Sequence, residues 1–294
     1  MQQDKLIVIL ADISGYTRFM LENRTSAVHG QLCINSLIEA ILEHVNIPLT
    51  LQEIEGDAVF LYARHPDTEA NWATMVQEIS EKLDKFFEAF IAQLGLTAES
   101  TLCGCAICRN GDKLGLKIIV HAGEAVFHEV AGRPQVSGPD VILAHRLLKN
   151  SVDSNEYLLL TENAFQLMAA HIEGKFEAHE ESYEGFDRVR AHVRFLDGEV
   201  LAARDAVYQL NDNERQEAVD SYLGWVERHI KPAAVQQMRS PIRGFSWFDR
   251  LLMIWEARVG FRVFRSLARR SISAAQRARG KRREEWGPAD RLQI

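Results

Sequence analysis

Two aspartates at the ends of apolar segments are the residues best suited to chemistry. Asp12 closes the apolar run 6–11, and Asp57 follows Gly56 at a predicted hairpin turn before the apolar run 58–62. A carboxylate at a strand end is held rigidly, and a neighbouring glycine leaves room for a ligand to approach. Two such carboxylates brought together would bind Mg²⁺ or Mn²⁺, which prefer oxygen ligands. The alternative is that both are ordinary strand-end aspartates with a structural role.

Four segments place these aspartates in a wider pattern. They are Ala11-Asp12-Ile13-Ser14-Gly15-Tyr16-Thr17, Gly56-Asp57-Ala58, the run 116–126 with His121-Ala122-Gly123-Glu124, and the run 136–147 ending in His145-Arg146-Leu147. Their spelling, order and spacing resemble the catalytic domains of class III nucleotidyl cyclases over residues 5–197. The His-x-Gly-Glu segment and residues 138–150 also resemble a bacterial branch of cyclase-like proteins described as a domain of unknown function.

The resemblance implies a reaction and a set of roles. In a cyclase the 3′-hydroxyl of a nucleoside triphosphate attacks the α-phosphate and expels pyrophosphate, so the protein chiefly positions metal and phosphates. The resemblance assigns two Mg²⁺ or Mn²⁺ ions to Asp12, Asp57 and the carbonyl of Ile13. It assigns transition-state charge stabilisation to Arg146, across a head-to-tail homodimer. The nucleotide-binding positions that it implies are Gly15, Tyr16, Thr17, Glu53 and Gln135.

The departures from the family pattern concern catalysis. The asparagine expected four residues before Arg146 is Ile142, which has no hydrogen-bonding group in its side chain. A lysine that grips the triphosphate is expected near Gly185 and has no clear match. Glu53 is the residue type seen in guanylyl rather than adenylyl cyclases, but Gln135 can both donate and accept, so the base stays open. The alternative to an active cyclase is an inactive cyclase-homology module that acts through dimerisation or through a partner or a membrane.

Hydrophobic periodicity and breaker residues predict an α+β fold, with Thr161 as a helix N-cap. The order β-α-β-β-α-β is the ferredoxin-like plan. The predicted elements are strand 5–11, helix 28–45, hairpin strands 50–54 and 58–63, helix 72–91, strands 116–120 and 125–130, helix 140–150, strand 157–160 and helix 161–171. A helical extension is predicted over residues 200–294.

Charge is unevenly distributed along the chain. Residues 239–283 hold thirteen Lys and Arg against two acids, a net charge of +11, so the remainder carries −18 within the total of −7. No run of about 18 apolar residues predicts a membrane span, and the polar N-terminus does not resemble a signal peptide. We therefore expect a cytoplasmic protein. The basic segment would pack on the acidic body or contact an anionic membrane peripherally; no known motif favours nucleic acid.

Three of the four cysteines lie close together, at Cys103, Cys105 and Cys108. Thiolates at this spacing could bind Zn²⁺, with Cys33 or a histidine as fourth ligand. Zinc signatures usually pair two such clusters, and the chain has one, so we favour reduced cysteines in a loop.

Overall fold

The computed structural model of the 294-residue chain describes residues 1–22, 27–46, 48–66, 68–100 and 114–196. The elements are β1 Gln2–Ser14, α1 Tyr16–Glu22, α2 Ala27–Leu42, β2 Thr50–Glu55, β3 Ala58–Arg64, α3 Glu69–Ser100, β4 Gly115–Val130, β5 Arg133–Ser137, α5 Pro139–Leu147, β6 Tyr157–Thr161, α6 Glu162–Met168, a 3₁₀ helix Ala169–His171, β7 Glu177–Glu181 and β8 Val189–Phe195.

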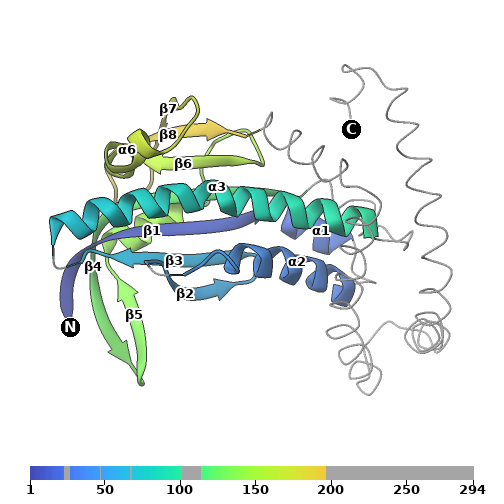
Figure 1. Ribbon diagram of the computed structural model, residues 1–294, viewed down its shortest axis with the longest axis horizontal. Coiled ribbons are helices and arrows are strands. Elements are labelled where there is room, and N and C mark those ends of the chain that lie inside the picture. The colour runs from blue at the N-terminus through green and yellow to red at the C-terminus, as the bar shows by residue number, and fades with distance from the viewer. Residues whose placement is uncertain (23–26, 47, 67, 101–113, 197–294) are drawn as a thin grey trace.

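One eight-stranded sheet organises these elements (Figure 1). The strand order is β2-β3-β1-β4-β6-β8-β7, and β5 pairs with β4. Strand β1 is antiparallel to both β3 and β4, and β2 is antiparallel to β3. The part β4-β1-β3-β2 therefore has the order and directions of a ferredoxin-like βαββαβ unit. The predicted α+β fold is confirmed.

Alternation along β1 divides the core between the two faces of the sheet. Ile7, Ile9 and Ala11 face a large cluster built with α2, α3 and α6. Leu6, Val8 and Leu10 face a second cluster that α5 completes. Asp12 continues the even-numbered series, so it belongs to the α5 side of the sheet.

The predicted strands need two corrections. The two strands expected at 116–120 and 125–130 form a single strand, β4, so His121 to Glu124 are not a turn. Strand β5 was not predicted; it pairs with the far half of β4 through a turn at Ala131 and Gly132, both with positive φ. Thr161 lies at the N-cap of α6, as predicted, but makes no side-chain capping hydrogen bond.

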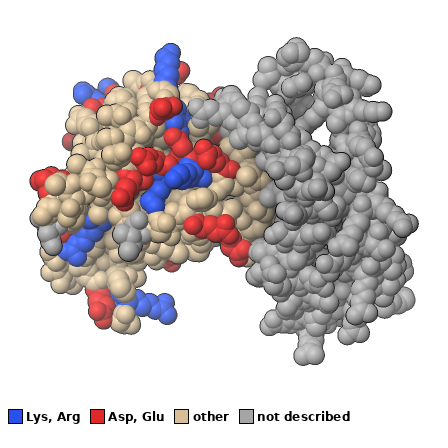
Figure 2. All heavy atoms as spheres, viewed as in Figure 1, with Lys and Arg blue, Asp and Glu red and all other residues tan. Residues whose placement is uncertain are grey.

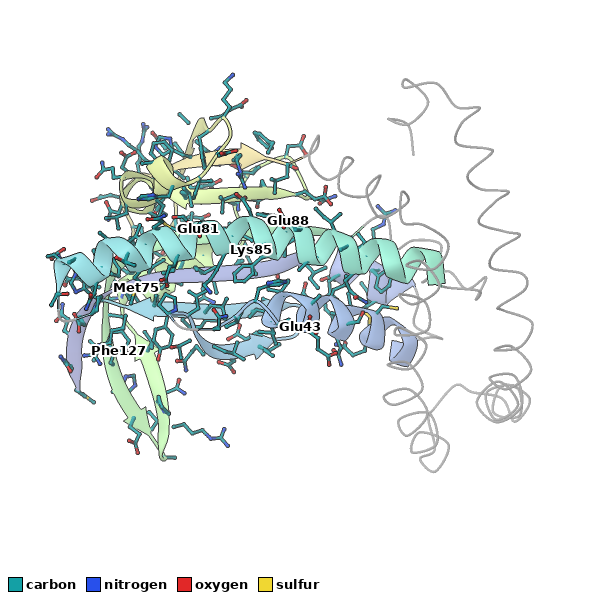
Figure 3. The ribbon with its side chains drawn as sticks, viewed as in Figure 1. Glu43, Met75, Glu81, Lys85, Glu88 and Phe127 are labelled. Carbon is teal, nitrogen blue, oxygen red and sulfur yellow. The ribbon has the colours of Figure 1, made fainter. Side chains whose placement is uncertain are left out.

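The face that carries α3 is charged (Figure 2). Glu81 and Glu88 flank Lys85 along this helix (Figure 3). None of the helices within the described ranges combines the length and the apolar character needed to cross a membrane. The extension predicted over 200–294 lies outside the described residues.

Candidate metal and nucleotide site

Asp12 is held between the two strands that flank β1. Its cross-strand neighbours are Ala58 on β3 and Lys117 on β4. The next residue, Ile13, donates its backbone N–H to the carbonyl oxygen of Asp57 at 3.3 Å. The end of β1 is thereby tied to the β2–β3 turn, and the two predicted metal-binding positions become structural neighbours.

Asp57 lies in that turn because Gly56 adopts a left-handed backbone, with φ at 67°. Such a conformation favours glycine, so the Gly-Asp pair is what a tight turn requires here. The pKa of Asp57 is raised to about 6, chiefly by burial and next by the negative charge of Asp12. The hydrogen bond to its own backbone and the charge of Lys117 lower that pKa in part. The two carboxylates therefore act on each other electrostatically, as expected for a shared cation site.

Lys117 is the site residue that the sequence reasoning did not single out. Its ammonium lies 2.8 Å from Asp12 Oδ2, and the two side chains are only 19% and 16% exposed. The same ammonium donates to the backbone carbonyl of Leu148, just after α5, at 3.0 Å. A lysine inside an otherwise apolar strand, 116–120, was the available signal, because an inward-facing charge in a strand requires a partner.

The donor chemistry fits a hard divalent cation. Two carboxylates and nearby backbone carbonyls are oxygen donors of the kind that Mg²⁺ and Mn²⁺ bind. Within the described part of the chain, no group of three or more His, Cys, Asp or Glu side chains is placed to hold a metal ion. Asp12 and Asp57 would therefore supply an incomplete ligand set, which phosphate oxygens and water complete in many magnesium sites.

The two predicted base-selecting positions lie on β2 and β5, strands that do not pair with each other but are joined by a side-chain hydrogen bond. Glu53 is exposed on β2 and pairs with Phe60 on β3 just after a register shift. Gln135 is half-buried on β5. The residues that precede them are joined, since Gln52 Nε2 donates to the carbonyl of Pro134 at 3.2 Å. Positions 82 residues apart in the sequence are thus close in space.

Helix α5 presents the predicted transition-state position to the exterior. Val141, Leu143, Ala144 and Leu147 are buried against the sheet. Ile142 is 53% exposed, and Arg146 is also exposed one turn later. Their exposure leaves both side chains available to a ligand or a second copy of the chain.

The N-terminal end of α5 is fixed to β4 through Asp140. Its Oδ2 accepts the backbone N–H of Glu124 at 2.7 Å, and its Oδ1 lies 3.2 Å from His121 Nε2. The hydrogen bond from His121 lowers the pKa of Asp140 below its usual value. His121 Nδ1 in turn lies 2.9 Å from Thr161 Oγ1, which explains why that hydroxyl does not cap α6. His121 thus connects β4 to α5 and β6.

The remaining predicted positions have separate surroundings. Gly15 has φ at 84° and opens α1, in which Tyr16 and Thr17 are the first residues. The Tyr16 hydroxyl donates to Gln31 Oε1 on α2 at 3.3 Å, whereas Thr17 is exposed. The predicted zinc ligands, Cys103, Cys105 and Cys108, lie outside the described residues.

The chain is similar in sequence to a described family and to a mycobacterial protein. The family described as "Protein of unknown function (DUF2652)" matches residues 34–157. An uncharacterized protein of Mycobacterium tuberculosis is 27% identical over 156 residues, covering 53% of this chain and 70% of that protein.

Similar solved structures are nucleotidyl cyclases. The adenylyl cyclase CyaB from P. aeruginosa is 16% identical, with a TM-score of 0.48, over 67% of this chain and 96% of that one. A bacterial light-regulated adenylyl cyclase is 12% identical, with a TM-score of 0.48, over 71% and 99%. The guanylate cyclase domain of a Catenaria anguillulae protein in complex with GTP is 16% identical, with a TM-score of 0.44, over 66% and 98%. The family match agrees with the predicted resemblance to a domain of unknown function, and the fold itself rests on the strand order above.

Proposed function

We propose that this chain is a cyclase-like domain that binds a nucleoside triphosphate with divalent metal ions and acts in intracellular signalling. The observation that carries the proposal is the electrostatic coupling of Asp12 and Asp57, which a strand end and a glycine turn bring to one place. Neighbouring carboxylates, one of which raises the pKa of the other, gain stability when a divalent cation joins them. Phosphate oxygens of the nucleotide then supply the remaining ligands of the metal ion.

In the catalytic form of this proposal, the chain forms a cyclic nucleotide and releases pyrophosphate. Asp12 and Asp57 hold Mg²⁺ or Mn²⁺, which would neutralise phosphate charge and orient the triphosphate. Glu53 and Gln135 contact the base from β2 and β5. Arg146 balances negative charge that develops on the α-phosphate, an effect of roughly 2–4 kcal/mol for comparable electrostatic stabilisers. Because Arg146 is exposed, a second copy of the chain is the natural source of the opposing aspartates.

Binding and turnover are tested separately. Calorimetry with ATP, GTP, CTP and UTP in Mn²⁺ should give a metal-dependent signal with at least one nucleotide, and Asp57→Ala should abolish it. Equal binding by Asp57→Ala would refute the metal site. A product assay across the same four triphosphates then identifies the base and decides whether the chain is an enzyme.

The second candidate function is a regulatory module that binds nucleotide or a partner without turnover. Ile142 favours it, because an apolar side chain occupies the exposed turn before Arg146. Loss of one polar contact at a transition state typically costs 10²–10³-fold in rate. The two candidates separate in the product assay, since the module binds nucleotide and releases no pyrophosphate.

The basic segment 239–283 adds a membrane-binding proposal that is compatible with either function. Each Lys or Arg near an anionic bilayer contributes about 1 kcal/mol of binding, an effect that salt weakens. We expect the full chain to sediment with anionic vesicles at low salt and a truncation after Lys231 to stay in solution. Failure of the full chain to sediment would leave packing against the acidic body as the role of the segment.

A further inference from the structure

The ammonium of Lys117 already neutralises one of the two carboxylates proposed to bind metal. It contacts Asp12 Oδ2 at 2.8 Å within a largely buried pair. Its second contact, to the Leu148 carbonyl at 3.0 Å, fixes the lysine independently of Asp12. Release of Asp12 would therefore leave the ammonium beside the site instead of in solvent.

The presence of Lys117 changes the net charge of the site. With Asp12, Asp57 and Lys117 ionised, the three groups together carry −1 instead of −2. Unit charges a few ångströms apart interact strongly at a partly buried position, because solvent screens them less than at an exposed surface. A divalent cation that approaches Asp12 must therefore compete with Lys117 and then remain close to its positive charge.

We propose that Lys117 is a built-in counter-ion of Asp12, which weakens the binding of a bare divalent cation and favours a cation that arrives with an anionic ligand. This inference rests on the proposed function, since it presupposes metal at Asp12 and Asp57. It adds a condition for metal binding. The two carboxylates bind a free metal ion weakly, and they bind it more tightly when a polyanion on the metal compensates the positive charge of Lys117. The carbonyl of Leu148 is the anchor that keeps the lysine in place throughout.

Mn²⁺ alone is the probe, titrated into the full chain without nucleotide and followed by the electron paramagnetic resonance signal of free Mn²⁺. Lys117→Met should bind Mn²⁺ about fivefold more tightly than wild type, or better, because one competing positive charge is gone. Lys117→Arg keeps the charge and should stay within about twofold of wild type. Lys85→Met is the matched control, because it makes the same change of net charge on α3, on the other side of the sheet (Figure 3). It should leave the affinity unchanged.

The outcomes separate this inference from the proposed function. Equal or weaker Mn²⁺ binding by Lys117→Met overturns the counter-ion role while leaving a metal site that Asp57→Ala abolishes. An equal gain in Lys85→Met also overturns it, because general charge would then be the cause. If neither wild type nor Lys117→Met binds Mn²⁺ alone, the counter-ion role is also overturned, because removal of the lysine charge has not opened the site to bare metal. The metal site of the proposed function is then decided by the calorimetry with nucleotide. Should thermal melting show Lys117→Met to be unfolded, Lys117→Gln, which can still donate to Leu148, gives the same comparison.

Discussion

Ile142 and Arg146 lie one helical turn apart on the exposed side of α5, while their neighbours Val141 and Leu147 pack into the core. Residues four apart share a helix face, so one side chain borders the other. The core contacts of α5 are made by different residues, which means that substitutions at Ile142 and Arg146 test function without disturbing the fold.

Arg146→Ala is expected to lower cyclic nucleotide formation by about 10²–10³-fold, as removal of one electrostatic stabiliser does elsewhere. The free energy of unfolding should stay within ~0.5 kcal/mol of wild type because the side chain is exposed. Product formation and urea denaturation measure the two effects. Lys85→Ala is the control, since Lys85 is exposed on α3, on the other side of the sheet from α5. An equal loss in both variants would contradict a specific role for Arg146.

Ile142→Asn is expected to raise the rate of cyclisation by roughly tenfold or more, because it restores one polar contact at the transition state. Ile142 is 53% exposed, so the change leaves no cavity and stability should hold. Ile142→Ala serves as the control, since it removes the apolar bulk without adding an amide. A gain in both variants would show that the isoleucine acts by steric exclusion, and a gain in neither would favour the regulatory module.

Asp57 makes the stability of the fold depend on pH in a predictable direction. Its pKa is about 6 in the folded chain against the ordinary value of 3.8, so folding disfavours its ionised form. This cost is fully present above pH 6, falls as the pH drops from 6 to 3.8, and disappears below 3.8, where the folded and unfolded chains both carry the proton. Asp57→Asn should therefore stabilise the chain by ~1–2 kcal/mol at pH 7.5, allowing for partial exposure, and by nothing at about pH 3.

Urea denaturation in the presence of a chelator measures this difference. Addition of Mn²⁺ at pH 7.5 should then stabilise wild type and leave Asp57→Asn unchanged, because binding to the folded state adds stability by mass action. A variant less stable than wild type at pH 7.5 would contradict the raised pKa.

The sequence was sufficient for the elements whose signal is local. The apolar run before Asp12 and the Gly56-Asp57 turn predicted β1 and the β2–β3 hairpin, and apolar spacing predicted α2 and α3. The split of β4 was wrong because Gly123 suggested a turn. In the structure Gly123 is a point of close approach to α5, a tertiary cause that local propensity does not reveal.

The site was predictable only in part. Asp12 and Asp57 were found because their neighbours in the sequence are distinctive. Lys117 was missed because its partner is 105 residues away in the sequence and becomes adjacent only through the β1–β4 register. The roles proposed for Asp12, Asp57, Glu53, Gln135 and Arg146 remain predictions that the experiments above test.

The close packing of β4 against α5 gives a last prediction. A Cβ atom on Gly123 would lie 2.3 Å from Asp140 Oδ2 and 2.8 Å from Asp140 Cβ, so Gly123→Ala must displace this side chain. The displacement would break the hydrogen bonds to Glu124 and His121 that hold the start of α5. We expect a loss of ~2–3 kcal/mol in the free energy of unfolding, from overpacking together with lost hydrogen bonds.

A double-mutant cycle with Asp140→Ala checks this mechanism. Asp140→Ala alone should cost about 1–2 kcal/mol. Adding Gly123→Ala to it should cost less than in wild type, because the carboxylate is gone and only the contact between the two Cβ atoms, 2.8 Å apart, remains to be relieved. Gly123→Ala should also reduce the function of Arg146, since α5 would lose its anchor to β4. Fully additive costs in the cycle would mean that Gly123 is required for a reason other than the approach of the Asp140 carboxylate.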